Sequence, residues 1–220
     1  MSKLHIDSIR KSFGGKQILT DVYLSCKAGE IIGLLGRNGS GKSTLLKIIF
    51  GSMPADGKFI RVDSNLLNSI NQKRNLISYL PQESFLPSQL KMRTAIKLFC
   101  SASNASKLFS NQLMRPFLNK KTSQLSGGEQ RLAEVLLIIH SPAKFILIDE
   151  PFNGIAPLYK DELKALITEL AINKGFIITD HDHKNIIDIS SRIILLFDGG
   201  TKEISTKKEL MEWGYLPIVK

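Results

Sequence analysis

The stretch that most constrains the fold is a glycine-rich run at residues 36–43, Gly-Arg-Asn-Gly-Ser-Gly-Lys-Ser. It follows the apolar residues 31–35, which predict a strand, and precedes residues 44–50, which predict a helix. Residues without a Cβ let a loop close around a phosphate, and the helix N-terminus behind it adds about half a positive charge. This order predicts a nucleotide site in which Lys42 reaches the β- and γ-phosphates and the Ser43 hydroxyl holds Mg²⁺. A glycine-rich turn is the alternative, and the flanking strand and helix argue against it.

A second pair of glycines lies in residues 125–130, Leu-Ser-Gly-Gly-Glu-Gln, ahead of the helical stretch 131–140. Ser126, Gly127 and Gly128 therefore predict a second helix N-terminus that binds an anion. Taken alone, this stretch is also typical of a flexible turn capped by Ser126. More than eighty residues and a polar insert separate the two phosphate sites, so they need not face one pocket. A second copy of the chain is then implied.

Two adjacent carboxylates, Asp149 and Glu150, follow the short apolar run at residues 145–148. Such a run predicts a strand buried on both faces. Ligands of open parallel sheets bind at the carboxyl ends of the strands, which is where these two residues fall. Because neighbouring residues of a strand point to opposite faces, the two carboxylates should have different roles.

From about residue 4 to about residue 213, the chain resembles the nucleotide-binding domain of ATP-binding cassette (ABC) ATPases. Residues 36–43 match the Walker A motif of this family, residues 125–130 its signature motif and residues 145–149 its Walker B strand. The resemblance implies an α/β fold, a P-loop core with a mostly parallel sheet, an N-terminal antiparallel β-subdomain and a small α-helical insert. It implies one domain over residues 1–220, with the insert at about residues 83–140.

The resemblance also implies the roles of further residues. Glu150 stands at the position of the general base, Gln82 at that of the glutamine that touches Mg²⁺ and the attacking water, and His181 at that of the γ-phosphate contact. Phe13 lies where the family carries an aromatic that stacks on adenine. The implied sets are Glu150, His181, Gln82 and Lys42 for catalysis, Phe13, Gly36, Asn38, Gly39, Ser40, Gly41, Lys42, Ser43, Thr44, Ser126, Gly127 and Gly128 for ATP, and Ser43, Gln82 and Asp149 for Mg²⁺.

Some of these matches have plainer interpretations outside the family. Phe13 would then be an ordinary aromatic at a strand end, and Gln82 a surface glutamine after a proline. The run Asp-His-Asp-His at residues 180–183 resembles a metal cluster, but alternation along a strand would split it across two faces.

The resemblance implies a Mg²⁺-dependent ATP hydrolase that works as a head-to-tail homodimer, with each ATP between Lys42 of one copy and Ser126 of the other. It implies an ABC transporter subunit, peripheral on the cytoplasmic face of the membrane and joined to separate transmembrane subunits. Residues 83–90 would form part of the groove that receives a helix of those subunits, with Phe85 and Leu86 against it. The alternatives are a soluble ABC ATPase acting on ribosomes or nucleic acid, which normally has two cassettes or a coiled-coil insert, and a slow ATP-dependent regulator.

Two departures from the family pattern predict an atypical branch. Ala156 stands where many members carry an aspartate that helps communication across the dimer. Residues 135–139 are all apolar where the family commonly has Ala-Arg-Ala-Leu, which suggests a rearranged packing of that helix.

The chain is basic, with a net charge of +10. A basic domain suits nucleic acid, an anionic membrane surface or ATP. The basic residues are scattered along the sequence, with only short pairs such as Lys120-Lys121, and no nucleic-acid motif with interleaved aromatic residues is present. This distribution favours proximity to a membrane. Cys26 and Cys100 have neither metal nor disulfide spacing, which favours a reducing compartment. No apolar run of about 18 residues is present, so membrane-spanning subunits would be separate chains.

The remaining pattern predicts the elements around these motifs. Strands are predicted at residues 4–10, 18–26, 30–35, 58–62, 76–80, 145–148, 175–179 and 192–197, and helices at 42–50, 129–140, 158–172 and 182–190. Within the insert, Ala95, Ile96, Leu98 and Phe99 have helical spacing. A second helix is expected near residues 108–114, with Pro116 ending it.

Overall fold

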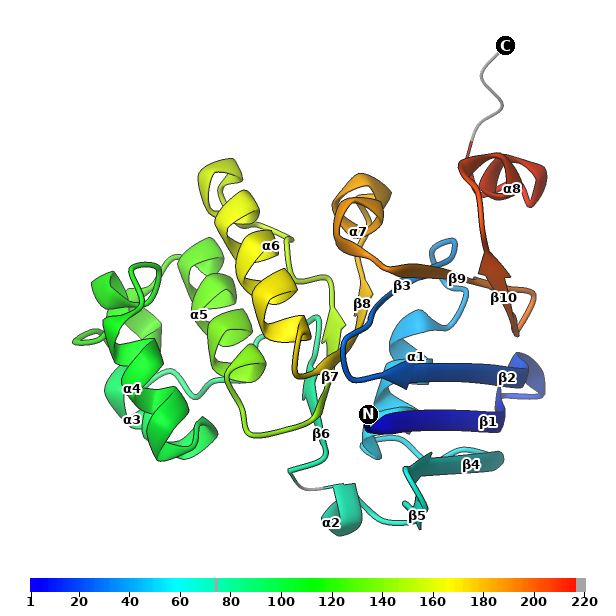
Figure 1. Ribbon diagram of the computed structural model, residues 1–220, viewed down its shortest axis with the longest axis horizontal. Helices are drawn as coiled ribbons and strands as arrows, with labels where there is room; N and C mark the ends of the chain where they lie inside the picture. The colour runs from blue at the N-terminus through cyan, green and yellow to red at the C-terminus, as the bar shows by residue number, and fades with distance from the viewer. Residues whose placement is uncertain (74, 217–220) are drawn as a thin grey trace.

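The computed structural model describes residues 1–73 and 75–216, and Figure 1 shows their arrangement. The strands are β1 (Lys3–Phe13), β2 (Lys16–Lys27), β3 (Ile31–Leu35), β4 (Gly57–Val62), β5 (Asn65–Leu66), β6 (Ile77–Leu80), β7 (Phe145–Asp149), β8 (Gly175–Thr179), β9 (Arg192–Phe197) and β10 (Gly200–Ile204). The α-helices are α1 (Lys42–Phe50), α2 (Ile70–Lys73), α3 (Met92–Phe99), α4 (Ala102–Ser110), α5 (Gly127–Ile139), α6 (Pro157–Ala171), α7 (His183–Ile189) and α8 (Lys207–Glu212). Two 3-10 helices, η1 (Arg115–Phe117) and η2 (Thr122–Gln124), lie between α4 and α5.

The strands form one sheet with an antiparallel part and a parallel part. Its order is β5-β4-β1-β2-β10-β9-β3-β8-β7-β6. The pairs among β1, β2, β4 and β5 are antiparallel, whereas β9, β3, β8, β7 and β6 pair in parallel. The predicted fold class, with a mostly parallel core and an N-terminal antiparallel part, is confirmed. The carboxyl ends of β3, β7 and β8 meet at one edge, where ligands of parallel sheets bind.

Helix α1 connects the two parts of the sheet. It buries Leu45, Leu46, Ile48 and Ile49 in a cluster that also contains residues of β1, β2, β3 and β7. The apolar positions cover much of the helix surface, as expected for a helix packed inside a fold. The phosphate loop before α1 is therefore attached to a rigid helix on one side and to the central strand β3 on the other.

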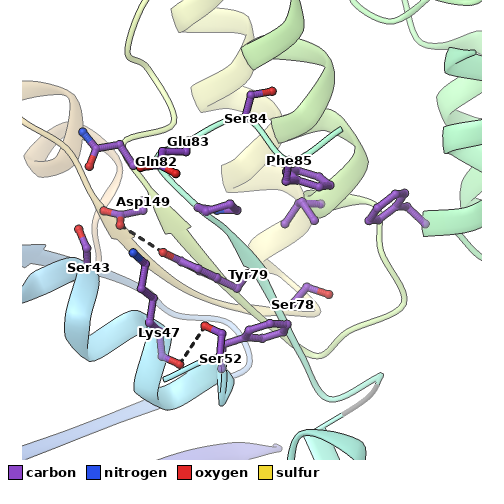
Figure 2. A pocket seen from close by; sticks show the side chains of 14 residues that line it. Ser43, Lys47, Ser52, Ser78, Tyr79, Gln82, Glu83, Ser84, Phe85 and Asp149 are labelled. Carbon is purple, nitrogen blue, oxygen red and sulfur yellow. Dashed lines mark hydrogen bonds between the residues drawn. The ribbon is translucent and has the colours of Figure 1, made fainter. Parts of the chain in front are cut away.

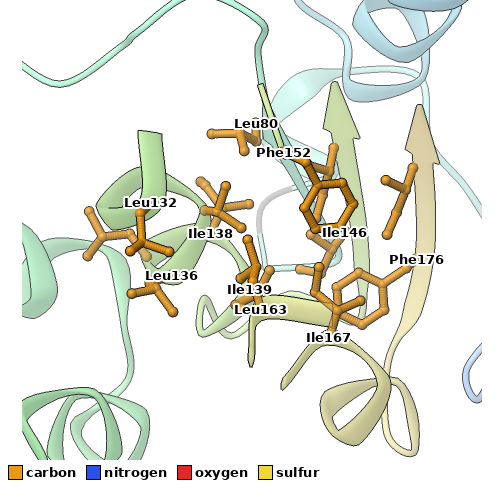
Figure 3. Packing of buried hydrophobic residues seen from close by; sticks show 14 of the residues in the cluster. Leu80, Leu132, Leu136, Ile138, Ile139, Ile146, Phe152, Leu163, Ile167 and Phe176 are labelled. Atoms are coloured by element: carbon orange, nitrogen blue, oxygen red, sulfur yellow. The ribbon is translucent and has the colours of Figure 1, made fainter. Parts of the chain in front are cut away.

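A second cluster packs α5 and α6 on the other face of the parallel strands. Ile139 of α5 and Ile167 of α6 lie near Ile146 of β7 and Phe176 of β8, and Leu136 belongs to the same cluster on the side of Leu132 (Figure 3). The apolar stretch 135–139, which departs from the family pattern, is entirely buried in this cluster. The apolar side chains of this stretch therefore pack α5 against the core.

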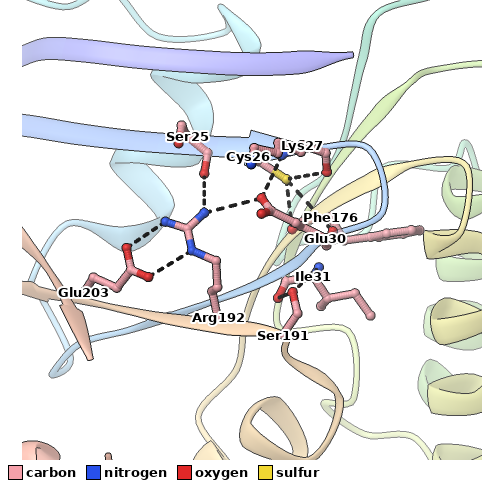
Figure 4. Close-up of polar contacts among 9 residues, drawn as sticks. All are labelled: Ser25, Cys26, Lys27, Glu30, Ile31, Phe176, Ser191, Arg192 and Glu203. Carbon is pink, nitrogen blue, oxygen red and sulfur yellow. Dashed lines mark hydrogen bonds and ion pairs between the residues drawn. The ribbon is translucent and has the colours of Figure 1, made fainter. Parts of the chain in front are cut away.

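Arg192 of β9 joins two other strands and the turn before β3 (Figure 4). Its guanidinium pairs with Glu203 of β10 at 2.7 Å, pairs with Glu30 at 3.3 Å and donates to the carbonyl of Ser25 in β2 at 3.2 Å. Close by, the buried thiol of Cys26 lies 3.6 Å from the carbonyl oxygen of Phe176, and burial raises its pKa. These contacts hold the antiparallel part against the parallel core.

The eight predicted strands are present, and α1 has the predicted bounds; β5, β10, α2 and α8 were not predicted. The prediction was wrong on the second helix of the insert. Helix α4 ends at Ser110, because the side chain of Asn111 accepts from the amides of Leu113 and Met114 and starts a new turn. Pro116 lies within η1 and does not end α4. Leu98 belongs to α3 as predicted but is 69% exposed, so it is no core residue.

Candidate nucleotide-binding site

The loop between β3 and α1 has the backbone that a phosphate loop requires. Gly39 and Gly41 have φ angles of 78° and 102°, a region that side chains with a Cβ rarely adopt. The Lys42 amine folds back over the loop and donates to the carbonyl oxygens of Gly36 at 2.7 Å and Arg37 at 3.3 Å. Burial lowers the pKa of Lys42, while Asp149 and Glu150 oppose that shift. A phosphate could replace both carbonyl oxygens as the partner of this amine.

A pocket of about 360 Å³ opens above the loop and gathers most of the predicted site residues. They come from five separate stretches of chain. Its lining contains Phe13, Asn38, Gly39, Gly41, Lys42, Ser43, Thr44, Gln82, Glu150 and His181, together with Ile18. Phe13 ends β1 at the rim with 47% of its surface exposed, and the Lys11 amine lies 5.0 Å from its ring centre. A flat aromatic at the rim can hold a base while the loop holds phosphates.

Glu150, Gln82 and His181 converge on one side of this pocket. The Nε2 of His181 lies 2.7 Å from one carboxylate oxygen of Glu150, and the Gln82 amide donates to the other at 3.1 Å. Glu150 has a φ of 55°, and its amide donates to the carbonyl of Thr179 at 2.7 Å. A non-glycine residue in this region stores backbone strain, which is common at functional sites. Burial raises the pKa of Glu150, and His181 opposes that shift.

Asp149 lies beneath the pocket, beside Ser43 (Figure 2). Its side chain is buried near the Ser43 hydroxyl, and Tyr79 donates to it at 3.3 Å. Burial raises the pKa of Asp149, and the Ser43 and Tyr79 hydroxyls oppose that shift. A hydroxyl and a carboxylate side by side are hard oxygen donors, so these residues fit Mg²⁺.

Some predicted residues lie away from the pocket. Gly36 and Ser40 do not line it, and the Ser40 hydroxyl is buried beside a smaller cavity next to Trp213 and Tyr215, with no hydrogen-bond partner among residues 1–73 and 75–216. Ser126, Gly127 and Gly128 also do not line it. Ser126 instead caps α5: its hydroxyl accepts from the Glu129 amide at 3.3 Å, and Glu129 accepts from the Ser126 amide at 2.7 Å. The Glu129 amide at this helix start is therefore already paired within the chain.

Arg131, which the sequence analysis did not single out, ties α5 to the pocket. Its guanidinium is buried and donates to the carbonyl oxygens of Pro81 at 2.7 Å, of Glu150 at 3.0 Å and of Asp149. One side chain of the signature helix thus holds both the loop that carries Gln82 and the end of β7. Its position directly after the signature stretch was the available signal, but its carbonyl partners are not visible in a sequence.

Glu134, one turn further along α5, holds the same loop from below. It is 1% exposed, and its Oε1 accepts from Ser84, from the amides of Phe85 and Leu86 at 3.2 and 3.4 Å, and from Gln130. Its other oxygen lies 3.8 Å from Arg131. Backbone movement of residues 84–86 would therefore be transmitted to α5.

A second cavity of about 570 Å³ lies next to the first (Figure 2). It runs from Ser43 and Asp149 past Tyr79 to Phe85 and Phe99, whose ring centres are 5.4 Å apart. Its outer end is partly apolar and lies between β6 and α3. We call this cavity the groove.

Ala156 is the N-cap residue of α6 and forms no side-chain hydrogen bond there. Pro157 has no N–H, and the Tyr159 amide already donates to the Ala156 carbonyl at 3.0 Å. An aspartate at this position could therefore accept mainly from the Leu158 amide. The replacement therefore leaves this helix start uncapped.

Comparison with known proteins identifies the family. The family model described as "ABC transporter" matches residues 19–153. The lipopolysaccharide export system ATP-binding protein LptB of Haemophilus influenzae is 30% identical, over 96% of this chain and 93% of its own length. The sulfate/thiosulfate import ATP-binding protein CysA of Bacillus cereus is also 30% identical, over 98% of this chain and 65% of its own.

Solved structures agree on the fold. A structure described as the ATP binding subunit of an ABC transporter has a TM-score of 0.85 at 20% identity, covering 96% of this chain and 93% of its own. A nucleotide-free ATP-binding cassette from an ABC transporter has a TM-score of 0.80 at 22% identity, covering 99% and 96%. None of these similarities supports the alternative of an ABC ATPase acting on ribosomes or nucleic acid. In the part of the chain described, no helix is long and apolar enough to cross a membrane. The chain belongs to the ATP-binding proteins of the ABC transporter family.

Proposed function

We propose that this protein is the Mg²⁺-dependent, ATP-hydrolysing subunit of a transporter whose membrane-spanning part is formed by other chains. The observation that carries the proposal is the meeting of Gln82, Glu150 and His181 beside the phosphate loop. A carboxylate that is held by two neighbours and aimed at the pocket is suited to orient a water molecule and accept its proton. The family relation supplies the nucleotide, ATP.

Charge on the transferred phosphoryl group would be balanced by groups already in position. Lys42 and the loop residues Asn38, Gly39 and Gly41 line the pocket, and Phe13 would stack on the base. Ser43, Asp149 and Gln82 would hold Mg²⁺, which supplies further charge neutralisation at the phosphates when bound. His181 would donate a hydrogen bond to the γ-phosphate after releasing Glu150, and needs no positive charge to do so.

The signature residues Ser126, Gly127 and Gly128 support a dimer. They do not line their own chain's pocket, yet they begin a helix of thirteen residues whose first amides lack partners within that helix. In a head-to-tail homodimer they would contact the γ-phosphate held by Lys42 of the partner. ATP would then stabilise the closed dimer, and hydrolysis would remove the group that both copies hold.

The groove supports docking of a membrane subunit. It joins the Mg²⁺ ligands at one end to Phe85 and Phe99 at the other, and it suits an amphipathic helix laid along it. Through Glu134 and Arg131, movement of residues 84–86 would reach both the signature helix and the end of β7. The whole chain would thereby lie on the cytoplasmic face of the membrane, as one domain with α3 and α4 in its helical insert.

The test combines two measurements. Purified protein should release phosphate from ATP with Mg²⁺ and lose this activity with EDTA. Phe85→Asp should keep the rate of the isolated protein within about threefold, yet weaken association by a few kcal/mol, because an unpaired charge would be buried at the interface. Equal recovery of membrane subunits with wild type and Phe85→Asp in detergent would show that the groove is not the docking surface.

A further inference from the structure

The positive charge of this protein is concentrated in one segment. Residues 84–128 contain seven of the 30 basic residues and no aspartate or glutamate. They therefore supply seven of the ten units of net positive charge, although they form about a fifth of the chain. The basic residues themselves are spread along the chain, as expected, and the net charge is concentrated here because acidic residues are missing between them.

Four of these cations gather around α3, at the end of the molecule remote from β1 and β2 (Figure 1). Lys91 and Lys121 are partners in a short antiparallel bridge, so their side chains lie on the same side of it. Arg93 donates to Asn119 at 3.0 Å and packs over Phe109, and Lys97 follows one helical turn later. We call Lys91, Arg93, Lys97 and Lys121 the basic face. Among the described residues, none of the four forms an ion pair with a carboxylate.

Lys91 and Arg93 of the basic face lie at a helix end that repels cations, whereas Lys97 lies in the last turn, where the helix dipole favours a cation. Lys91 is the N-cap residue of α3 and makes no capping hydrogen bond, and the first turn holds Arg93 and no acidic residue. The positive end of the helix dipole disfavours the two cations near it. An outside anion would offset this repulsion. Local electrostatics that oppose the fold are typical of functional surfaces.

The exposed apolar side chain on this helix favours lipid over nucleic acid. Leu98 is 69% exposed and follows Lys97 directly. Phe85, Phe99 and Phe109 are partly buried, so they offer no free ring for stacking on bases. The basic face is also continuous with the groove, since Phe99 of α3 lines it. This last point rests on the docking proposed above, whereas the distribution of charge does not.

We propose that the basic face binds anionic lipid headgroups at the membrane surface, with Leu98 entering the interface beside them. A juxtamembrane lysine or arginine contributes roughly 1 kcal/mol at an anionic leaflet, which is about fivefold in affinity. The lipid contact would hold the phosphate loop and the groove at a fixed height below the membrane subunits.

The test is sedimentation with vesicles of phosphatidylcholine alone or mixed with phosphatidylglycerol, with no membrane subunit present. The test variant is Lys91→Gln, Lys97→Gln, Lys121→Gln; it spares Arg93, which packs on Phe109. The matched control, Lys27→Gln, Lys58→Gln, Lys202→Gln, removes the same charge from exposed positions of β2, β4 and β10. Both variants should hydrolyse ATP like the wild type, which shows that they fold.

We expect the test variant to bind phosphatidylglycerol vesicles at least about tenfold more weakly, given about fivefold for each charge, and the control to change much less. Equal losses in both variants would reduce the effect to net charge and overturn the proposal. The proposal would also be overturned if the wild type bound a single-stranded RNA oligonucleotide more tightly than the vesicles and the test variant lost that binding. It would be overturned as well if the test variant bound vesicles normally but no longer co-purified with membrane subunits. Phe85→Asp should still bind the vesicles, so failure of the groove proposal would be seen separately.

Discussion

Replacing Glu134 with alanine should destabilise the protein through its contacts with residues 84–86. The substitution leaves the amides of Phe85 and Leu86 and the hydroxyl of Ser84 without their acceptor, and it removes the counter-charge 3.8 Å from Arg131. Removing one partner of a buried ion pair typically costs about 3–5 kcal/mol. Arg131 keeps three carbonyl acceptors, and Phe85 is only partly buried, so the lower end applies. We expect a loss of about 3 kcal/mol.

Thermal unfolding measures this loss directly. In a chain of this size, 1 kcal/mol shifts Tm by about 2–4 °C, so Glu134→Ala should lower Tm by about 6–12 °C. Hydrogen exchange should show faster exchange at the amides of Phe85 and Leu86. Glu134→Gln is the control, because its carbonyl oxygen can still accept from those amides and only the attraction to Arg131 is lost. A loss below about 1 kcal/mol in Glu134→Ala, or unchanged exchange at residues 85 and 86, would refute this reasoning.

Three further predictions concern other parts of the site. If the Phe13 ring stacks on adenine, Phe13→Ala should weaken ATP binding, measured by calorimetry, by roughly 1–3 kcal/mol. Because stacking accepts any base, the wild type should also bind GTP detectably. An unchanged affinity of the variant for ATP would show that Phe13 does not hold the base. Ala156→Asp should cap α6 and raise the free energy of unfolding by about 0.5–2 kcal/mol, which denaturant unfolding measures; no gain would mean that the Leu158 amide does not take up the aspartate as a cap. Burial raises the pKa of Glu150, so its protonated, inactive form should persist to a pH above the usual range of a carboxyl group. When kcat is measured against pH, its fall on the acid side should therefore begin at a higher pH than for an ordinary glutamate. A kcat that stays constant as the pH falls to the ordinary carboxyl range would contradict this.

The sequence carried most of the information on the phosphate loop. The spacing of Gly39, Gly41, Lys42 and Ser43 fixes a local backbone, so a short window was enough to predict it and to place α1. Strands β3, β7 and β8 were equally clear, because strands buried on both faces read as unbroken apolar runs. These features depend on neighbours in the chain.

The features missed depend on partners far away in the chain. Arg131 and Glu134 appear as ordinary charged residues of a helix, and only the fold brings Pro81, Phe85 and Glu150 against them. Strand β10 is polar and pairs along β9, so its own sequence gives little sign of a strand. The end of α4 was misjudged because Pro116 is a more obvious signal than the side-chain acceptor of Asn111.

The central claim is that Glu150 activates the water that attacks ATP, and the rate of phosphate release by Glu150→Gln tests it most directly. The substitution keeps the size of the side chain and an oxygen that can accept from His181 or Gln82, but it removes the base. The account predicts that ATP still binds and holds two copies together, as seen by size-exclusion chromatography, while the rate falls by at least about 10². Turnover close to the wild-type rate would contradict the claim.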